Sequence, residues 1–214
     1  LNGLPQDDQL FTLNLLPEGD TAHLVIGLNN FSSFQTDTLR IWTSMPNEVA
    51  DLQPENDTLE AIFRLSLSGP YTIGGSSPDF ATIGEAVTTL NTYHTCGPVT
   101  FRIRDGVYTE QISIDSIPTT SSTNTITFES ESLDSSAVTI QFTPPNSTKP
   151  AVFLLKGTDY VIFRHLGFKS LPSTFSDVLE LRYSADHITV SNCHFEGYQF
   201  GSSGVLIKCL NYGG

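Results

Sequence analysis

Short apolar stretches recur along the second half of the chain at steps of 26 or 27 residues. They are Val99–Ile103, Ile126–Ser130, Phe153–Gly157, Leu179–Tyr183 and Val205–Cys209. Because the side chains of a strand alternate between its two faces, the first and third residues of each stretch share one face. We therefore expect two inward columns of apolar side chains, Val99/Ile126/Phe153/Leu179/Val205 and Phe101/Phe128/Leu155/Leu181/Ile207.

A second short strand is predicted after several of these stretches, at Val138–Ile140, Val161–Phe163 and Ile188–Val190. Repeats of this length with two or more strands are typical of a solenoid, whose units bury their core only by stacking. An antiparallel sandwich with evenly spaced strands is the alternative. Columns that stay in register over five units favour an all-β fold built on a parallel β-helix, which we assign to residues 68–214.

Residues 1–67 show a different rhythm. Four strands are predicted there, Phe11–Leu15, His23–Leu28, Thr38–Trp42 and Leu59–Leu65, with turn-forming residues between them. Turns of this kind favour antiparallel pairing. We therefore expect a first β domain at residues 1–67, joined to the second by a short turn at Ser66–Gly75, which holds Gly69-Pro70 and Gly74-Gly75.

One α-helix is predicted, at about residues 80–93. Thr82 and Glu85 have the spacing of a capping box, and an apolar stripe is formed by Phe80, Ile83, Val87 and Leu90. An amphipathic helix just before the first coil suits a lid over the open end of a β-helix.

Charge and cysteine content narrow the classes of function. The 214 residues carry 23 acidic and 10 basic side chains, a net charge of −13, which disfavours a nucleic-acid partner. No apolar run approaches the ~20 residues of a membrane span, and we expect a secreted or cell-surface protein. Cys96, Cys193 and Cys209 form no metal-binding motif and are predicted to lie buried inside the coils. We expect no cofactor.

The predicted register produces one polar feature. Arg102, Glu129, Lys156, Arg182 and Lys208 would form an outward column with about 4.8 Å between rungs. This column is either a basic strip for acidic surface glycans or a solvated sheet face with a salt-bridge ladder of small energetic value.

The helix and first coil carry a family resemblance. Asp79–Val87 followed by Gly106–Ile112 resembles the opening of the pectin-lyase-like superfamily, pectin methylesterases above all. Tyr71–Gly75 and Cys96–Val99 are similar to the β-helical modules of large bacterial surface proteins exported by the type 9 route. These resemblances imply a right-handed parallel β-helix in an extracellular bacterial protein.

The first domain resembles the latter half of an immunoglobulin-like sandwich of the cell-adhesion-related bacterial type. The matching motifs are Leu16–Asp20, Trp42–Asn47 and Pro54–Thr58. Such a sandwich needs about seven strands. The missing strands would therefore either precede Leu1 in a longer chain or be donated by a partner molecule.

The resemblance also suggests where catalysis would reside. Pectin methylesterases use two Asp residues with Gln and Arg, and Asn192–Gln199 resembles one of their segments, but Phe200 stands where an Asp would be expected. We identify no catalytic residue. The leading hypothesis is a non-catalytic structural or adhesive segment of a surface fibre. The alternative is a carbohydrate-active β-helix with its site partly beyond Gly214. The last stretch has no capping helix, so we also expect more chain after it or end-to-end self-association.

Overall fold

The computed structural model describes residues 36–42, 58–64, 66–148, 150–198 and 204–210. The chain divides into two compact units, Leu1–Leu65 and Ser66–Gly214, each of which is described by itself.

The first unit contains an antiparallel pair of strands, β1 (Thr36–Trp42) and β2 (Thr58–Arg64). Ile41 lies opposite Leu59 in this pair, which forms sheet A. The two strands predicted at Thr38–Trp42 and Leu59–Leu65 are therefore present. The strands predicted at Phe11–Leu15 and His23–Leu28 lie outside the described residues, and the immunoglobulin-like sandwich stays a prediction.

The second unit contains one helix and thirteen strands in its described part. In chain order they are β3 (Leu67–Ile73), α1 (Ile83–Tyr93), β4 (Thr95–Ile103), β5 (Gly106–Thr109), β6 (Ile112–Ile114), β7 (Ile126–Ser130), β8 (Val138–Phe142), β9 (Ala151–Lys156), β10 (Val161–Arg164), β11 (Gly167–Ser170), β12 (Asp177–Arg182), β13 (Thr189–Ser191), β14 (His194–Glu196) and β15 (Ile207–Leu210). The strands form three sheets: sheet B in the order β13-β10-β7-β4-β3, sheet C in the order β14-β11-β8-β5, and sheet D in the order β15-β12-β9-β6.

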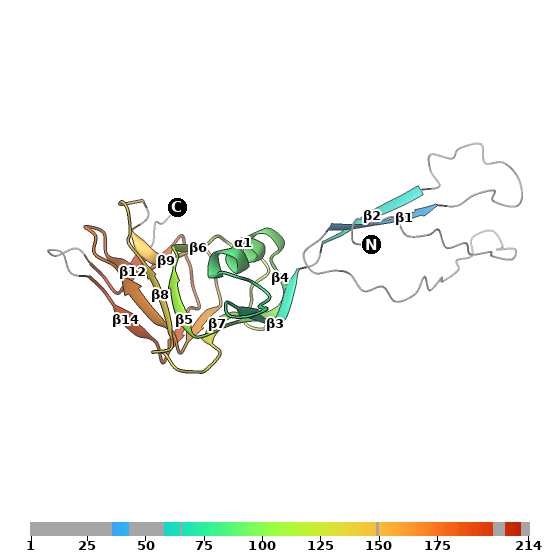
Figure 1. Ribbon diagram of the computed structural model, residues 1–214. Coiled ribbons are helices and arrows are strands. Elements are labelled where there is room, and N and C mark those ends of the chain that lie inside the picture. The colour runs from blue at the N-terminus through green and yellow to red at the C-terminus, as the bar shows by residue number, and fades with distance from the viewer. Residues whose placement is uncertain (1–35, 43–57, 65, 149, 199–203, 211–214) are drawn as a thin grey trace, which may run out of the picture. The chain divides into compact units, whose positions relative to one another are not determined.

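The chain visits these three sheets in a fixed order. From β4 onward, each coil places one strand in sheet B, the next in sheet C and the third in sheet D before the following coil begins (Figure 1). Every strand pair within the three sheets is parallel. The second unit is therefore a parallel β-helix, as predicted, and the antiparallel sandwich is wrong. The all-β class is confirmed.

The predicted register of the columns needs correction. Ile126 pairs with Val99 on one side and with Val161 on the other, all in sheet B. Phe153 instead pairs with Ile112 and Leu179 in sheet D. The equal steps of 27 residues thus cross from one sheet to another between positions 126 and 153. Side chains alternate between inward and outward in the strands of every sheet. The sequence spacing of apolar residues therefore does not show to which sheet a strand belongs.

Aromatic side chains fill the interior of the coils. The rings of Phe101 and Phe128 stack with their centroids 4.9 Å apart, and Phe163 continues the stack at 5.8 Å from Phe128. Phe153 from sheet D meets Phe163 edge to face at 4.9 Å. All four side chains are fully buried. These rings join sheet B to sheet D through the interior, because a ring in each coil contacts the next.

Helix α1 covers the first coil, lying against β6 and β3 (Figure 1). Its apolar stripe is buried as predicted, and the Thr82 hydroxyl caps it by accepting the Glu85 N–H at 3.0 Å. The Glu85 carboxylate accepts from the N–H of Ala81. A second carboxylate, from Glu110, accepts the N–H groups of Ile83 and Gly84 at 3.2 and 2.7 Å.

The junction between the units is largely strand, where a turn was predicted. β3 pairs in parallel with β4 and is the outermost strand of sheet B. Pro70 lies in this outermost strand, where the missing N–H is tolerated. Gly74 and Gly75 after the strand have positive φ values of 74° and 72°, and Gly69 within the strand has a φ of 87°.

At the other end of the solenoid the interior columns become exposed. Val190 continues the column of the buried Phe163 and is 36% exposed, and Ile207, beside the buried Leu179, is 43% exposed. The three cysteines are free, and Cys96 and Cys209 are exposed while Cys193 is partly buried. The prediction that they lie buried inside the coils is therefore wrong for Cys96 and Cys209. Cys209 does occupy an inward position opposite Leu181, but in the last described strand.

Candidate functional site

The outer face of sheet B carries a continuous polar column, which we call the sheet B ladder. Its members occupy equivalent positions on five neighbouring strands: Thr72, Arg102, Glu129, Arg164 and Ser191. They point outward because the residues before Arg102, Glu129 and Arg164 are the stacked phenylalanines of the core. The ladder therefore presents donors and acceptors at the strand spacing of about 4.8 Å.

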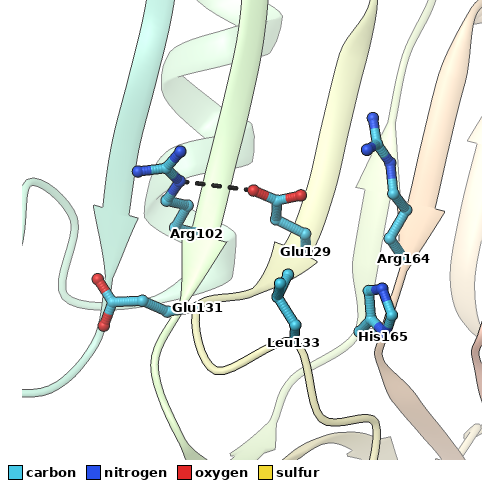
Figure 2. A pocket seen from close by; sticks show the side chains of 6 residues that line it. All are labelled: Arg102, Glu129, Glu131, Leu133, Arg164 and His165. Carbon is cyan, nitrogen blue, oxygen red and sulfur yellow. Dashed lines mark ion pairs between the residues drawn. The ribbon is translucent and has the colours of Figure 1, made fainter.

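A shallow hollow of about 380 Å³ lies over the central rungs of this ladder. It is lined by Arg102, Glu129, Glu131, Leu133, Arg164 and His165 (Figure 2). Glu131 and Leu133 lie in the turn that follows β7, and His165 lies in the turn that follows β10. Both turns lead to strands of sheet C.

Both carboxylates in the hollow are paired with arginines. Glu129 Oε1 lies 3.4 Å from Arg102 Nε, and Glu131 Oε2 lies 3.3 Å from Arg104 Nε. The Glu129 side chain is only 14% exposed. Both carboxylates are therefore directed toward arginines other than Arg164.

Arg164 is the exception in this arrangement. No carboxylate among the described residues pairs with its guanidinium, which is exposed and stands apart from Glu129 in Figure 2. His165 beside it is held through a contact of 3.5 Å between its Nε2 and the Asn192 Nδ2. The hollow thus contains one uncompensated positive charge, although the chain as a whole carries −13.

The structure separates the five residues predicted to form one outward column. Arg102 and Glu129 are neighbours, as expected. Lys156 and Arg182 are neighbours of each other, but in sheet D. Lys208 lies beside Glu180, one pleat away from Arg182. The single ladder is therefore two groups on different sheets, because the step from Glu129 to Lys156 crosses from sheet B to sheet D. Within sheet D the neighbour of Arg182 in the last described strand is Leu210 rather than Lys208.

The group on sheet D is a compact charge cluster. Lys208 Nζ lies 2.9 Å from Asp177 Oδ2, and Arg182 Nη2 lies 2.9 Å from Glu180 Oε2. The side chains of Asp177 and Glu180 are 3% and 0% exposed. The hydrogen bond to Asp177 raises the pKa of Lys208 above its usual value. The Lys208–Asp177 pair ties β15 to β12, whereas Glu180 Oε1 and Arg182 Nε are buried without a hydrogen-bond partner among the described residues.

Sequence reasoning missed Arg164, although a signal for it exists. Val99-Thr-Phe-Arg102 and Val161-Ile-Phe-Arg164 have the same pattern, and both lie in sheet B. Matching these tetrads would have placed Arg164 two rungs from Arg102. The step between Ile126 and Val161 is 35 residues, which the search for steps of 26 or 27 did not sample.

Among the described residues, no group of three or more His, Cys, Asp or Glu side chains is placed to hold a metal ion. No helix in the same residues is long and apolar enough to cross a membrane.

Comparison with known proteins gives pectin methylesterases among the structural neighbours. No family model matches the chain, and no curated protein matches it in sequence. Among solved structures, pectin methylesterase from Aspergillus niger aligns with a TM-score of 0.49 and 21% identity over 69% of this chain and 48% of the enzyme. Pectin methylesterase PemA from Erwinia chrysanthemi aligns with a TM-score of 0.48 and 14% identity over 67% and 46%.

A pectin methylesterase in complex with a hexasaccharide aligns with a TM-score of 0.47 and 14% identity. This chain spans about half the length of these enzymes. At this level of similarity no activity passes to the chain, and the parallel β-helix is established by its own strand pairing. Phe200, which stands where the resemblance would require an Asp, lies outside the described residues.

Proposed function

We propose that the solenoid is a polysaccharide-binding segment that holds its glycan along the outer face of sheet B. The observation that carries this proposal is the sheet B ladder with its hollow. Glycans present hydroxyl groups that both donate and accept hydrogen bonds. The serine, the two arginines and the glutamate of this row supply both partners on a flat surface, whereas the Thr72 hydroxyl is engaged by Asp79.

Other partner classes fit this face less well. A protein interface is built around buried aromatic and aliphatic anchors, whereas Leu133 is the one aliphatic side chain in the lining of the hollow. Nucleic acid requires clustered Lys and Arg, and here two of the three arginines near the hollow are paired with glutamates. A polar, nearly neutral groove is better matched to a sugar chain.

Binding is also better supported than hydrolysis. General acid–base chemistry on a sugar needs carboxyl groups that are free to take and give a proton. The carboxylates of the hollow are ion-paired, and those of the sheet D cluster are buried as well as paired. A role as a stiff structural or adhesive segment of a surface protein is compatible with glycan binding and stays a prediction.

Two matched double variants test the proposal. R102A/E129A removes one ion pair from the sheet B ladder, and K169A/E196A removes one ion pair, at 2.7 Å, from the outer face of sheet C. Net charge is unchanged in both. Affinity electrophoresis and calorimetry with a panel of acidic and neutral polysaccharides should show binding by the unmodified chain. We expect the sheet B variant to bind at least tenfold more weakly and the sheet C variant to bind normally. Absence of binding to every polysaccharide, or equal loss in both variants, would overturn the proposal.

A further inference from the structure

We propose that the last described coil is a docking surface for a second copy of the chain, so that two solenoids stack end to end about a two-fold axis. This inference is independent of the proposed glycan site. Strands β13, β14 and β15 are the outermost strands of sheets B, C and D at one end, and no described strand pairs with their free edges. Large apolar side chains in this coil are 36–47% exposed, which marks an interaction surface. They are Val190, Tyr198, Val205, Leu206 and Ile207.

The free edges also carry backbone groups that can pair with a further strand. His194 donates its N–H to the carbonyl of Leu166 in the preceding coil at 2.8 Å. Because alternate residues of a strand turn their backbone groups to opposite sides, Phe195 turns its N–H and C=O toward the open edge. The same holds for Val190, since the carbonyl of its neighbour Ser191 accepts an N–H from the preceding coil. A strand added here would cover the backbone edge and the interior columns together.

The opposite end of the solenoid does not offer such an edge in sheet B. The N–H of Thr72 is donated to Asp79 Oδ2 at 2.7 Å, and its carbonyl accepts the N–H of Phe80 at 3.1 Å. Pro70, two residues earlier on the same edge of β3, has no N–H to offer. Helix α1 also covers the first coil (Figure 1). A head-to-tail stack is therefore disfavoured, and the contact that remains joins like ends and closes after two copies.

The ends of two such coils have complementary shapes. The chain climbs along the solenoid axis as it passes from β13 to β14 and then to β15, so these strands form successive steps. A two-fold axis through the middle step places β14 against β14 of the second copy in antiparallel orientation. It also places β13, the most recessed step, against β15 of the second copy, the most protruding step. Like ends thus fit without a gap in any of the three sheets.

The sequence of β14 is self-complementary in this arrangement. The strand reads His194-Phe195-Glu196, with Phe195 facing the interior and its neighbours exposed on the outside. Antiparallel pairing about Phe195 sets each His194 opposite Glu196 of the second copy, and such opposite-charge pairs are favourable. The Phe195 ring already stacks on Phe168 at 5.1 Å and would continue the stack onto Phe195 of the second copy.

The charge of the three edge strands permits this contact. Glu196 and Lys208 are their only acidic and basic residues apart from His194, so the described edge is neutral although the chain carries −13. Two copies that approach through other faces would meet more like charge. The neutral, apolar end is therefore the part of the described surface best suited to self-association.

The oligomeric state of the 214-residue chain tests the inference. Light scattering and sedimentation across micromolar concentrations should show a mass that rises from 23.4 kDa to twice that value and no further. V190K places a charge in the contact and should hold the chain at the monomer mass. The matched control is V107K, because Val107 is 64% exposed on β5, away from the last coil, and this variant should still dimerise.

A charge exchange on β14 tests the two-fold arrangement itself. H194E and E196K change exposed side chains, so each variant should keep the β-helix, as circular dichroism will verify. Each alone should raise the dissociation constant of the dimer at least tenfold, because like charges then face each other. An equimolar mixture should form a mixed dimer again, since the carboxylate introduced by H194E meets the ammonium introduced by E196K.

Two cysteines provide a local readout of the same contact. Cys209 occupies an inward position of β15 and is exposed, while Cys96 is exposed in β4. We expect a thiol reagent to label Cys209 at least tenfold more slowly in the dimer than in the monomer, and Cys96 at an unchanged rate.

Several outcomes would overturn the inference. One is a monomer at every concentration; protection of β13, β14 and β15 from hydrogen exchange in that monomer would show that the chain covers this end itself. A mass that grows beyond two copies would show open-ended stacking instead of a two-fold contact. Equal effects of V190K and V107K, or a mixture of H194E and E196K that dimerises no better than either variant alone, would show that the contact lies elsewhere.

Discussion

Asp177 joins two coils of the β-helix through Lys208, whose Nζ lies 2.9 Å from its Oδ2. The other carboxylate oxygen, Oδ1, accepts the N–H of Val205 at 3.0 Å. Asp177 is the first residue of β12, Lys208 lies in β15, and Val205 lies two residues before β15 begins. A single buried carboxylate thus anchors the last described strand to the coil before it.

Removing this carboxylate should loosen the last coil. We expect D177A to lower the free energy of unfolding by about 2 kcal/mol, less than the loss of a fully buried pair because the Lys208 side chain is 36% exposed. Urea denaturation measures the change. The matched control is D115A, which breaks the exposed pair to Lys156 at 3.4 Å and should cost less than about 1 kcal/mol. Equal costs for both variants would contradict the anchoring role of Asp177.

The same pair predicts a dependence of stability on pH. The pKa of Lys208 is raised in the folded state, chiefly by its hydrogen bond to Asp177. The stabilisation is therefore fully present below the unfolded pKa of lysine, about 10.4, and is lost as the pH rises through the higher folded value. The difference in stability between the unmodified chain and K208M should be constant from neutral pH to mildly alkaline pH and should shrink beyond that. A difference that grows above this range would contradict the prediction.

The aromatic stack should dominate the stability of the solenoid. Phe128 touches Phe101, Phe153 and Phe163 and is fully buried. We expect F128A to cost about 3–5 kcal/mol, as large-to-small changes in packed cores do. Phe195 stacks on Phe168 at 5.1 Å but is only partly buried, so F195A should cost clearly less. Comparable losses in thermal and urea unfolding would show that the described end of the solenoid is as well packed as its middle.

Glu110 should stabilise α1 from 26 residues away. Its carboxylate accepts two N–H groups of the first turn, where the helix dipole also favours negative charge. We expect E110A to lower the free energy of unfolding by about 1–2 kcal/mol. The local cap provides a comparison, since T82A should cost about 1 kcal/mol. If E110A were neutral while T82A was not, the local cap alone would hold the helix end.

The sequence was sufficient for the architecture and not for the register. Apolar alternation in stretches such as Val99–Ile103 correctly predicted parallel coils, and Thr82 with Glu85 located the helix. The coils differ in length, however: Ile112 and Phe153 are neighbours 41 residues apart, whereas Phe153 and Leu179 are 26 apart. The extra residues lie in turns such as 115–125, which carry little periodic signal.

The uncertain register of the coils affected the prediction of the candidate site most. Arg102 and Glu129 were placed correctly because both belong to coils separated by the sampled step. Arg164 was missed, and Lys156, Arg182 and Lys208 were predicted to share a column with Arg102 although they lie in sheet D. Glu110 was also missed as a helix cap, because contacts between distant segments depend on the register that alternation leaves open.

Hydrogen exchange in the presence of a polysaccharide tests the central claim most directly, namely that the outer face of sheet B binds glycans. The 214-residue chain would be compared with and without alginate, polygalacturonate and a neutral polysaccharide, with peptides covering each sheet followed by mass spectrometry. We predict slower exchange at β7, β10 and the turns that hold Leu133 and His165, and unchanged exchange at β8 and β11. Protection confined to sheet C or sheet D, or none with any of these polymers, would contradict the account.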